Sequence, residues 1–165
     1  MNNFSKKMFH KDCLYRDIYL LNSEIQVVII SGYFNPLHIG HLDYMEEART
    51  LGTKLVVIVN NDEQVKVKGS VPFMPEDERL RIVSALKYVY GAVLSIDTDR
   101  TVCGTLGLLA RIMPSCPKVF ANGGDSNPKN VPETATCKEH GIEMVFGTGG
   151  EKTQSSSWLL NQSRK

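Results

Sequence analysis

Short apolar runs recur along the chain, and most of their residues are β-branched or otherwise large and hydrophobic. A continuous run of this kind is typical of a parallel strand that is buried on both faces of a sheet. The first such run leads directly into a turn rich in Gly and Pro, as strands in α/β proteins do. We interpret five segments as strands: residues 25–31, 54–60, 91–96, 118–121 and 142–146.

Segments with helical spacing of apolar residues separate these strands. Helix boundaries are marked by residues of the expected kinds: Pro75 at the first helical position, Gly52 as a C-cap, and the Asp-Thr-Asp segment at residues 97–99, which can cap the next helix. Strands that alternate with helices require right-handed crossovers and a parallel sheet. We predict helices at residues 39–51, 75–86, 101–113 and 134–140, with a further apolar helical run from Trp158. The fold class is therefore α/β, a Rossmann-like single domain with a five-stranded parallel sheet and helices on both faces.

Length and composition limit the possible functions. The 165 residues suffice for one domain, which we place at residues 25–165 behind an N-terminal extension at residues 1–24. A net charge of +1 argues against a nucleic-acid binder that relies on bulk positive charge. The four cysteines form no Cys-x-x-Cys pair, which favours free thiols. Without an apolar stretch long enough for a membrane span or a signal peptide, we expect a cytoplasmic protein.

The turn after the first predicted strand has the strongest chemical pattern. Residues 32–41 read Gly-Tyr-Phe-Asn-Pro-Leu-His-Ile-Gly-His. His38 and His41 are three residues apart at the start of a helix, so their side chains share one face. Gly40 has no Cβ, which lets a ligand approach the backbone, and free amides at a helix start favour anionic oxygens. The turn is therefore a candidate phosphate site.

This turn resembles the HxGH signature of the nucleotidyltransferase superfamily, whose members transfer a nucleoside monophosphate from CTP or ATP to a phosphate-bearing acceptor. Class I aminoacyl-tRNA synthetases also carry His-Ile-Gly-His. They require a longer chain and a Lys-Met-Ser-Lys-Ser-like loop, which is not found in the 165 residues. The chain is therefore identified as similar to nucleotidyltransferases, and the resemblance extends over roughly residues 25–160.

Two further segments resemble cytidylyltransferases for glycerol 3-phosphate or choline phosphate. Lys66 and Lys68 follow the second predicted strand, and in an extended loop they would point the same way. In the family, lysines of this loop contact phosphates. The Glu-Asp-Glu-Arg segment of the next helix places Arg79 where the family has an arginine that supports the site.

A glycine turn follows the fourth predicted strand, and a Gly- and Ser-rich segment follows the fifth. The first, with Asp125, corresponds to a glycine-aspartate turn beside the nucleotide in the superfamily. The second resembles the closing motif that grips the β- and γ-phosphates. Lys152 stands where cytidylyltransferases usually have arginine, and Gln154 replaces an isoleucine. Serine is also a good N-cap, so the same residues can begin a helix.

The resemblance assigns roles residue by residue. It gives catalytic roles to five residues: His38, His41, Lys66, Lys68 and Lys152. It gives nucleotide binding to Gly32, Tyr33, Phe34, Asn35, Gly40, Arg79, Asn122, Gly123, Gly124, Asp125, Thr153, Ser155, Ser156 and Ser157. We expect Mg²⁺ to arrive mainly on the triphosphate, because no dense carboxylate cluster is visible in the sequence. The resemblance also implies a homodimer.

The nucleotide is CTP in our preferred interpretation, because of the lysine loop and the Glu-Asp-Glu-Arg helix. ATP is the alternative, because Phe-Asn-Pro at residues 34–36 is more like adenylyltransferases, and Asn35 replaces the aspartate usual in cytidylyltransferases. The acceptor is a small phosphate- or phosphonate-bearing molecule that the sequence does not specify further. A nucleotide-binding module without catalysis is a second hypothesis, and a nucleic-acid-binding domain is disfavoured by the balanced charge. No membrane partner is expected.

Overall fold

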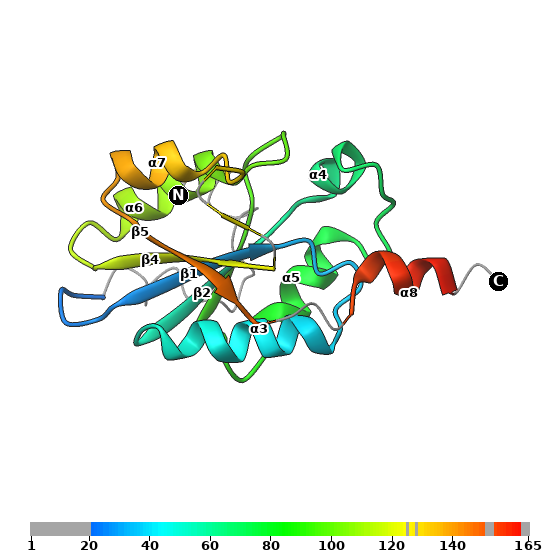
Figure 1. Cartoon of the computed structure of the whole chain (residues 1–165), viewed down its shortest axis with the longest axis horizontal. Helices are drawn as coiled ribbons and strands as arrows, with labels where there is room; N and C mark the ends of the chain where they lie inside the picture. Colours follow the sequence, from blue (N-terminus) through cyan, green and yellow to red (C-terminus); the bar gives the residue numbers. More distant parts are fainter. Residues whose placement is uncertain (1–20, 125, 128, 151–153, 163–165) are drawn as a thin grey trace.

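The computed structural model of the chain describes residues 21–124, 126–127, 129–150 and 154–162, and in these residues strands and helices alternate (Figure 1). The strands are β1 (Val27–Gly32), β2 (Lys54–Val59), β3 (Gly91–Leu94), β4 (Lys118–Gly123) and β5 (Glu143–Thr148). The helices are α3 (Ile39–Thr50), α4 (Asp62–Val67), α5 (Glu76–Ser84), α6 (Cys103–Ile112), α7 (Thr134–Glu139) and α8 (Ser156–Gln162).

The five strands form one parallel sheet in the order β3-β2-β1-β4-β5. The central strand β1 pairs with β2 along its whole length and with β4 over its first three residues. The chain first builds outward from β1 through β2 to β3, then returns to the other side of β1. This reversal confirms the predicted α/β class and creates a crevice at the carboxyl ends of β1 and β4, where ligands bind in open α/β sheets.

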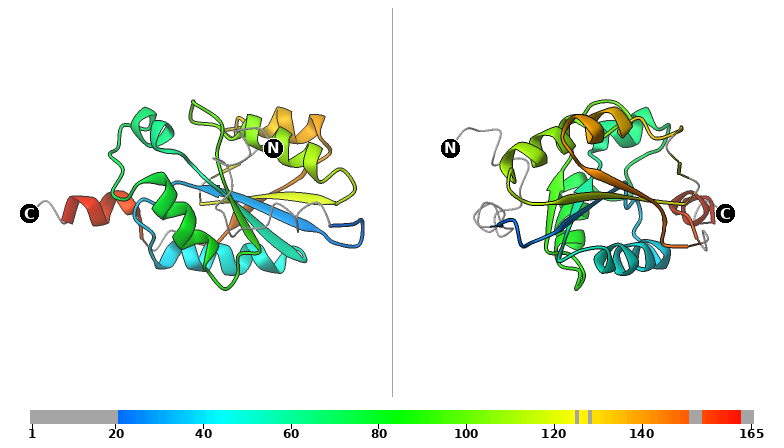
Figure 2. Two further views of the ribbon diagram at one scale, coloured as in Figure 1. Left: turned by 180° about the vertical axis from the view of Figure 1, so that it is seen from behind. Right: turned by 60° about the vertical axis from the view of Figure 1, so that its left-hand side comes forward.

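Helices cover both faces of the sheet, as Figures 1 and 2 show. Because side chains alternate along a strand, β1 sends Val28 and Ile30 to the face covered by α3 and α5, and Val27 and Ile29 to the face covered by α6 and α7. Each face has its own apolar core, and all four of these β1 residues are fully buried. The two cores fix the sheet rigidly and so position the loops at its carboxyl edge.

The segment after β2 differs from the predicted extended loop, because residues 62–67 form helix α4. Asn61 caps this helix by accepting a hydrogen bond from the amide of Gln64 at 2.9 Å. The side-chain amide of Gln64 donates in turn to the backbone carbonyls of Asp99 and Thr101. These tertiary contacts stabilise α4, because a helix of only six residues is not stable in water from its helical propensity alone. The expectation that Lys66 and Lys68 point the same way was therefore wrong.

Two predicted caps had different outcomes. In the predicted capping segment 97–99, Asp97 accepts hydrogen bonds from the amides of Gly104 and Thr105 at the start of α6, although the N-cap residue itself is Val102. Gly52 is not the C-cap of α3, because Leu51 occupies that position in a right-handed conformation. A Cβ on Gly52 would lie 2.7 Å from a methyl of Val28, so close packing accounts for the glycine. Pro75 is likewise the N-cap of α5, one residue before the predicted position.

The proposed N-terminal extension lies almost wholly outside the described residues. Of the predicted segment 1–24, the structure describes residues 21–24, and Leu21 packs against the core on the α6 face. No helix in the described part of the chain is long and apolar enough to cross a membrane.

Candidate active site

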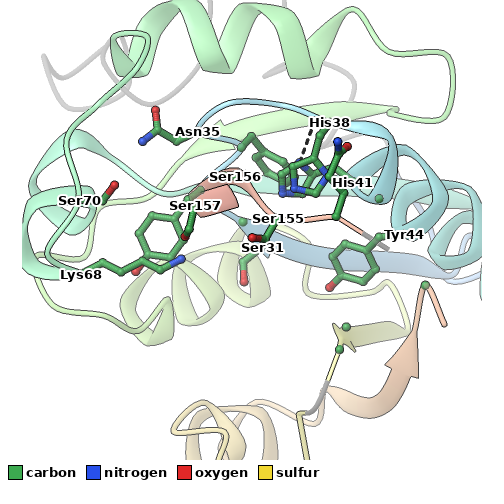
Figure 3. A pocket seen from close by; sticks show the side chains of 18 of the residues that line it. Ser31, Asn35, His38, His41, Tyr44, Lys68, Ser70, Ser155, Ser156 and Ser157 are labelled. Carbon is green, nitrogen blue, oxygen red and sulfur yellow. Dashed lines mark hydrogen bonds between the residues drawn. The ribbon is translucent and has the colours of Figure 1, made fainter. Parts of the chain in front are cut away.

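A cleft of about 790 Å³ opens at the carboxyl edge of the sheet. Its lining comes from the turn after β1, the end of α4 with the loop that follows it, the turns after β4 and β5, and the start of α8. Figure 3 shows Lys68 and Ser70 on one side of the cleft and Tyr44 on the other, with the histidine pair and Ser31 between them. The predicted loops therefore converge, although they are far apart in sequence.

His38 and His41 lie against each other at the start of α3. Their rings stack with centroids 3.7 Å apart, and the ring of His41 also contacts Phe34 edge-on at 5.0 Å. The Nδ1 atom of His41 accepts a hydrogen bond from the backbone amide of His38 at 3.2 Å. Neutral imidazole carries one proton, so this bond leaves the proton on Nε2. His41 can therefore donate a hydrogen bond to an anionic oxygen in the cleft.

The environment keeps His41 neutral. Burial, with smaller contributions from the nearby His38 and Lys68, lowers the pKa of His41 to about 3. A neutral donor can stabilise negative charge that develops during a reaction without first binding it as a fixed cation would. His41 is thus suited to hydrogen-bond a phosphoryl oxygen at neutral pH.

Phe34 shapes the turn that carries the histidines. Its backbone has a positive φ of 46°, unusual for a residue other than glycine, and its side chain is 1% exposed. The ring packs so closely on Gly32 that a Cβ there would lie 2.6 Å from it. Gly32 is therefore needed for close packing within the turn, although both residues also border the cleft.

Asn35 fastens the turn to the loop between α4 and α5. Its side-chain amide donates to the carbonyl of Val71 at 2.8 Å, and its carbonyl oxygen accepts from the amide of Phe73 at 2.5 Å. Asn35 itself is 4% exposed, whereas Val71 and Phe73 are exposed, so the bonds are partly buried. Asn35 borders the cleft, but its polar atoms are committed to the protein backbone. An aspartate in its place could not donate to Val71.

Arg79, predicted to bind nucleotide, lies beneath the cleft and is not among the residues that line it. Its side chain is 1% exposed and donates to the carbonyls of Tyr33 and Asn60, both at 2.7 Å, and of Met74 at 3.1 Å. It also forms an ion pair of 2.6 Å with Asp62. The guanidinium therefore ties the turn after β1 to the ends of β2 and the α4–α5 loop, which agrees with a supporting role and corrects the assignment to direct contact.

The two lysines after β2 have separate environments. Lys68, the C-cap of α4, lines the cleft, and its Nζ atom lies 4.2 Å from the ring centroid of Tyr33. Lys66 pairs with Glu63 at 2.8 Å, and its side chain is 60% exposed and does not line the cleft. Residues two apart point to nearly opposite sides of a helix, so α4 separates them. The structure brings Lys68 to the site and leaves Lys66 outside it.

The turn after β4 brings Asn122, Gly123 and Gly124 to the cleft. A Cβ on Gly123 would approach the Thr148 carbonyl oxygen at 3.1 Å, and Gly124 has a positive φ of 62°. Both glycines are thus required by the backbone itself. The predicted contact of Asp125 lies outside the described residues.

Tyr44 is a cleft residue that sequence reasoning missed. It packs against Gly149, where a Cβ would lie 3.0 Å from the Cα of Tyr44, and its hydroxyl donates to the Ala121 carbonyl at 2.6 Å. On the next turn of α3, Glu47 accepts from the Gly149 amide at 2.8 Å. Helix α3 therefore holds the turns after β4 and β5 in place. The sequence pattern could have predicted Tyr44 as a cleft residue, because Tyr44 continues the three-residue spacing of His38 and His41.

The closing segment places three serines at the cleft. Ser155 caps α8 by accepting from the amide of Trp158 at 3.3 Å, and Ser156 donates to the Pro36 carbonyl at 2.9 Å. Ser157 also lines the cleft. The start of α8 is thereby attached to the turn that bears the histidines. Lys152 and Thr153, predicted to grip phosphates, lie outside the described residues.

Comparisons with known proteins agree with this geometry. Residues 29–153 match a family model described as cytidylyltransferase-like. An FAD synthase from Methanothrix thermoacetophila is 54% identical over 72 residues, which cover 44% of this chain and 50% of that protein. The bifunctional protein HldE of Pelobacter propionicus is 34% identical over 133 residues, covering 78% of this chain and 25% of that protein. The matched regions thus span half or less of these relatives.

Among solved structures, the lipopolysaccharide core biosynthesis protein from Thermoplasma volcanium GSS1 has the same fold. It aligns with a TM-score of 0.61 and 27% sequence identity, and the alignment covers 74% of this chain and 95% of that chain.

Proposed function

Since the chain belongs to the cytidylyltransferase-like family of HxGH nucleotidyltransferases, we propose that it transfers a nucleoside monophosphate from a nucleoside triphosphate to a small molecule bearing a phosphate or phosphonate. The observation that supports this most is the convergence of the stacked histidines, Lys68 and the serines of α8 on one cleft. Imidazole, ammonium and hydroxyl groups can donate to phosphate oxygens, although the Ser156 hydroxyl already donates to Pro36, and they come from three separate elements.

In the proposed reaction, an acceptor oxygen attacks the α-phosphorus, the bond from that phosphorus to the bridging oxygen breaks, and pyrophosphate leaves. The protein has little covalent chemistry to perform, so alignment and charge stabilisation supply the rate. His41 donates from Nε2 to an α-phosphate oxygen, with His38 stacked beside it. Lys68 neutralises the acceptor and α-phosphates, and Ser155 to Ser157 face the leaving pyrophosphate.

ATP is the donor that we propose first, in place of the CTP expected from sequence. The relatives named FAD synthase would, by the chemistry of FAD, join adenylate to a flavin phosphate. The lysine loop that favoured CTP contributes one lysine to the cleft instead of two. CTP stays the second candidate, because the matching family model is cytidylyltransferase-like.

We propose that Mg²⁺ enters with the triphosphate. In the described ranges, no group of three or more His, Cys, Asp or Glu side chains is placed to hold a metal ion. A Mg²⁺ carried by phosphates and water needs few protein ligands. When bound, it would neutralise charge on the triphosphate oxygens.

Pyrophosphate release tests the proposal. The purified full-length chain is incubated with Mg²⁺ and ATP or CTP and a panel of acceptors that includes flavin mononucleotide, sugar phosphates, polyol phosphates and phosphonates. We expect release that depends on one acceptor class and is faster with ATP. Binding of nucleotide without release for any donor and acceptor pair would favour the module without catalysis. Faster release with CTP would restore the sequence-based preference.

A further inference from the structure

Tyr33 and Lys68 form a pair at the wall of the cleft. The Nζ atom of Lys68 lies 4.2 Å from the centroid of the Tyr33 ring, within the range of an attractive cation–π contact. Both residues line the same cleft as the histidines. The charge of Lys68 is close enough to His41 to contribute to the lowering of its pKa. The ammonium group therefore lies over an aromatic face in the cleft that the imidazoles also line.

The backbone of Tyr33 is anchored from below. Its carbonyl accepts a hydrogen bond of 2.7 Å from Arg79, which is 1% exposed. The side chain is partly buried, and burial raises the pKa of its hydroxyl. A buried guanidinium thus fixes the backbone from which the aromatic ring reaches the lysine.

Lysine side chains are flexible, so one at a helix end samples many positions unless something restrains it. Lys66, in the same helix, is held outward by Glu63. A carboxylate at the position of Tyr33 would restrain Lys68 but would also repel phosphate. An aromatic face restrains an ammonium group without adding negative charge beside a bound phosphate.

We propose that Tyr33 is a positioning residue that holds the Lys68 ammonium in the cleft beside the histidine pair, ready to meet a phosphate oxygen. This inference rests on the proposed nucleotidyl transfer for its catalytic consequence. Tyr33 makes no contact of its own with the reacting atoms in this account. Its ring restrains Lys68, and its hydroxyl is not required.

Kinetics of three variants test this role. Tyr33→Phe keeps the aromatic face and should stay within about twofold of the wild-type kcat/KM. Tyr33→Leu should lower kcat/KM by roughly three- to thirty-fold, the range given by a single cation–π contact. In a Lys68→Gln background, Tyr33→Leu should cause little further loss of kcat/KM, because the effects of two substitutions are not additive when one residue acts through the other. Equal losses in both backgrounds would overturn the proposal.

A spectroscopic readout separates this inference from the proposed function. With ¹³C-labelled lysine, the ε-methylene protons of Lys68 should show an upfield ring-current shift, assigned by Lys68→Gln. The shift should persist in Tyr33→Phe and vanish in Tyr33→Leu. A matched control is Tyr90→Leu, which removes a cation–π contact of the same 4.2 Å with Lys54 at the opposite edge of the sheet and should leave kcat/KM unchanged.

Each outcome has one meaning. If the Lys68 shift is unchanged in Tyr33→Leu, the pair does not exist in solution and the inference fails. If the shift vanishes but kcat/KM does not fall, Tyr33 has no positioning role. If the wild-type chain releases no pyrophosphate, the proposed function fails. Calorimetric titration with ATP and Mg²⁺ then tests the inference, which requires Tyr33→Leu to weaken ATP binding.

Discussion

His38 and His41 have the same side chain, but the fold uses them differently. His38 is the N-cap of α3 in an extended conformation, and its amide orients the ring of His41. His41 lies one turn inside the helix, where the hydrogen bond fixes its tautomer and burial keeps it neutral. One residue therefore prepares the other, and a substitution at either position should disturb the pair.

His41→Ala should reduce kcat by on the order of 10²-fold or more, by analogy with the loss of one oxyanion donor. The reason is that the variant lacks the Nε2 donor for the α-phosphate. Steady-state pyrophosphate release measures the effect. His140→Ala serves as the control, because His140 packs on Gly107 of α6, outside the cleft. Near-normal kcat in His41→Ala would remove His41 from the mechanism.

The low pKa of His41 predicts a pH dependence of stability. The folded-state pKa is about 3, below the unfolded value near 6.5, so between these values the unfolded state binds more protons. The free energy of unfolding should therefore fall as pH falls through this window, by at most about 1.4 kcal/mol per pH unit from this group. Urea unfolding between about pH 4 and about pH 6 should show a shallower slope in His41→Gln than in the wild type. The same pH dependence of the free energy of unfolding in both proteins would contradict a lowered pKa of His41 in the folded state.

At the scale of elements, two side chains hold the loops around the cleft. Arg79 reaches from α5 to three carbonyls and Asp62, and Asn35 reaches from the turn after β1 to the loop at residues 71–73. The carbonyls and amide that these side chains bind lie in loops, outside the hydrogen-bond pattern of a helix or a strand. The loops keep their shape because the buried side chains of Arg79 and Asn35 supply the hydrogen bonds that a helix or strand would otherwise supply.

Arg79→Gln should destabilise the protein by roughly 3–5 kcal/mol, because a partly buried ion pair is broken and three carbonyls lose a buried donor. Urea unfolding followed by circular dichroism measures the loss. Arg81→Gln, two residues later on the exposed side of the same helix, should change stability by less than about 0.5 kcal/mol. Similar losses in the two variants would show that Arg79 is not the link between the loops.

Asn35→Asp tests the attachment of the loop at residues 71–73. The carboxylate can still accept from Phe73 but cannot donate to Val71, whose carbonyl it would face at close range. We expect a loss of about 1–3 kcal/mol in the free energy of unfolding, the cost of an unpaired buried polar group. The amides of residues 70–73 should exchange with deuterium faster than in the wild type. Unchanged exchange would place the restraint of this loop elsewhere.

The sequence predicted the strands well and this loop region poorly, for a physical reason. Runs such as residues 55–59 are apolar throughout, so local composition alone marks them as buried strands. Helix α4 has no such mark, because Gln64 and Asn61 are polar and gain their helical role from partners some 35 residues away. The histidine pair could be predicted from its spacing, and Lys68 from the resemblance of its loop to cytidylyltransferases. The displacement of Lys66 and the buried role of Arg79 depend on tertiary contacts that no local pattern contains.

For the whole molecule, ligand binding and folding are linked. ATP with Mg²⁺ contacts elements from both halves of the sheet in our proposal, so it binds the folded chain alone. At about 100 times its dissociation constant it should add about 2.7 kcal/mol of stability. For a chain of this length, this corresponds to a rise of roughly 5–11 °C in Tm. Differential scanning fluorimetry with ATP and with CTP measures it, and a larger rise with CTP would argue for the other donor.

The return of the chain across β1 has a further consequence. Every loop of the cleft leaves the carboxyl edge of the sheet, whereas the close packing on Gly52 lies at the amino edge. A change of cleft side chains that respects the packed glycines therefore leaves the packing at the amino edge intact. A lineage with this architecture can acquire new acceptors by altering loops while its framework stays under separate selection, which gives the protein room to diversify.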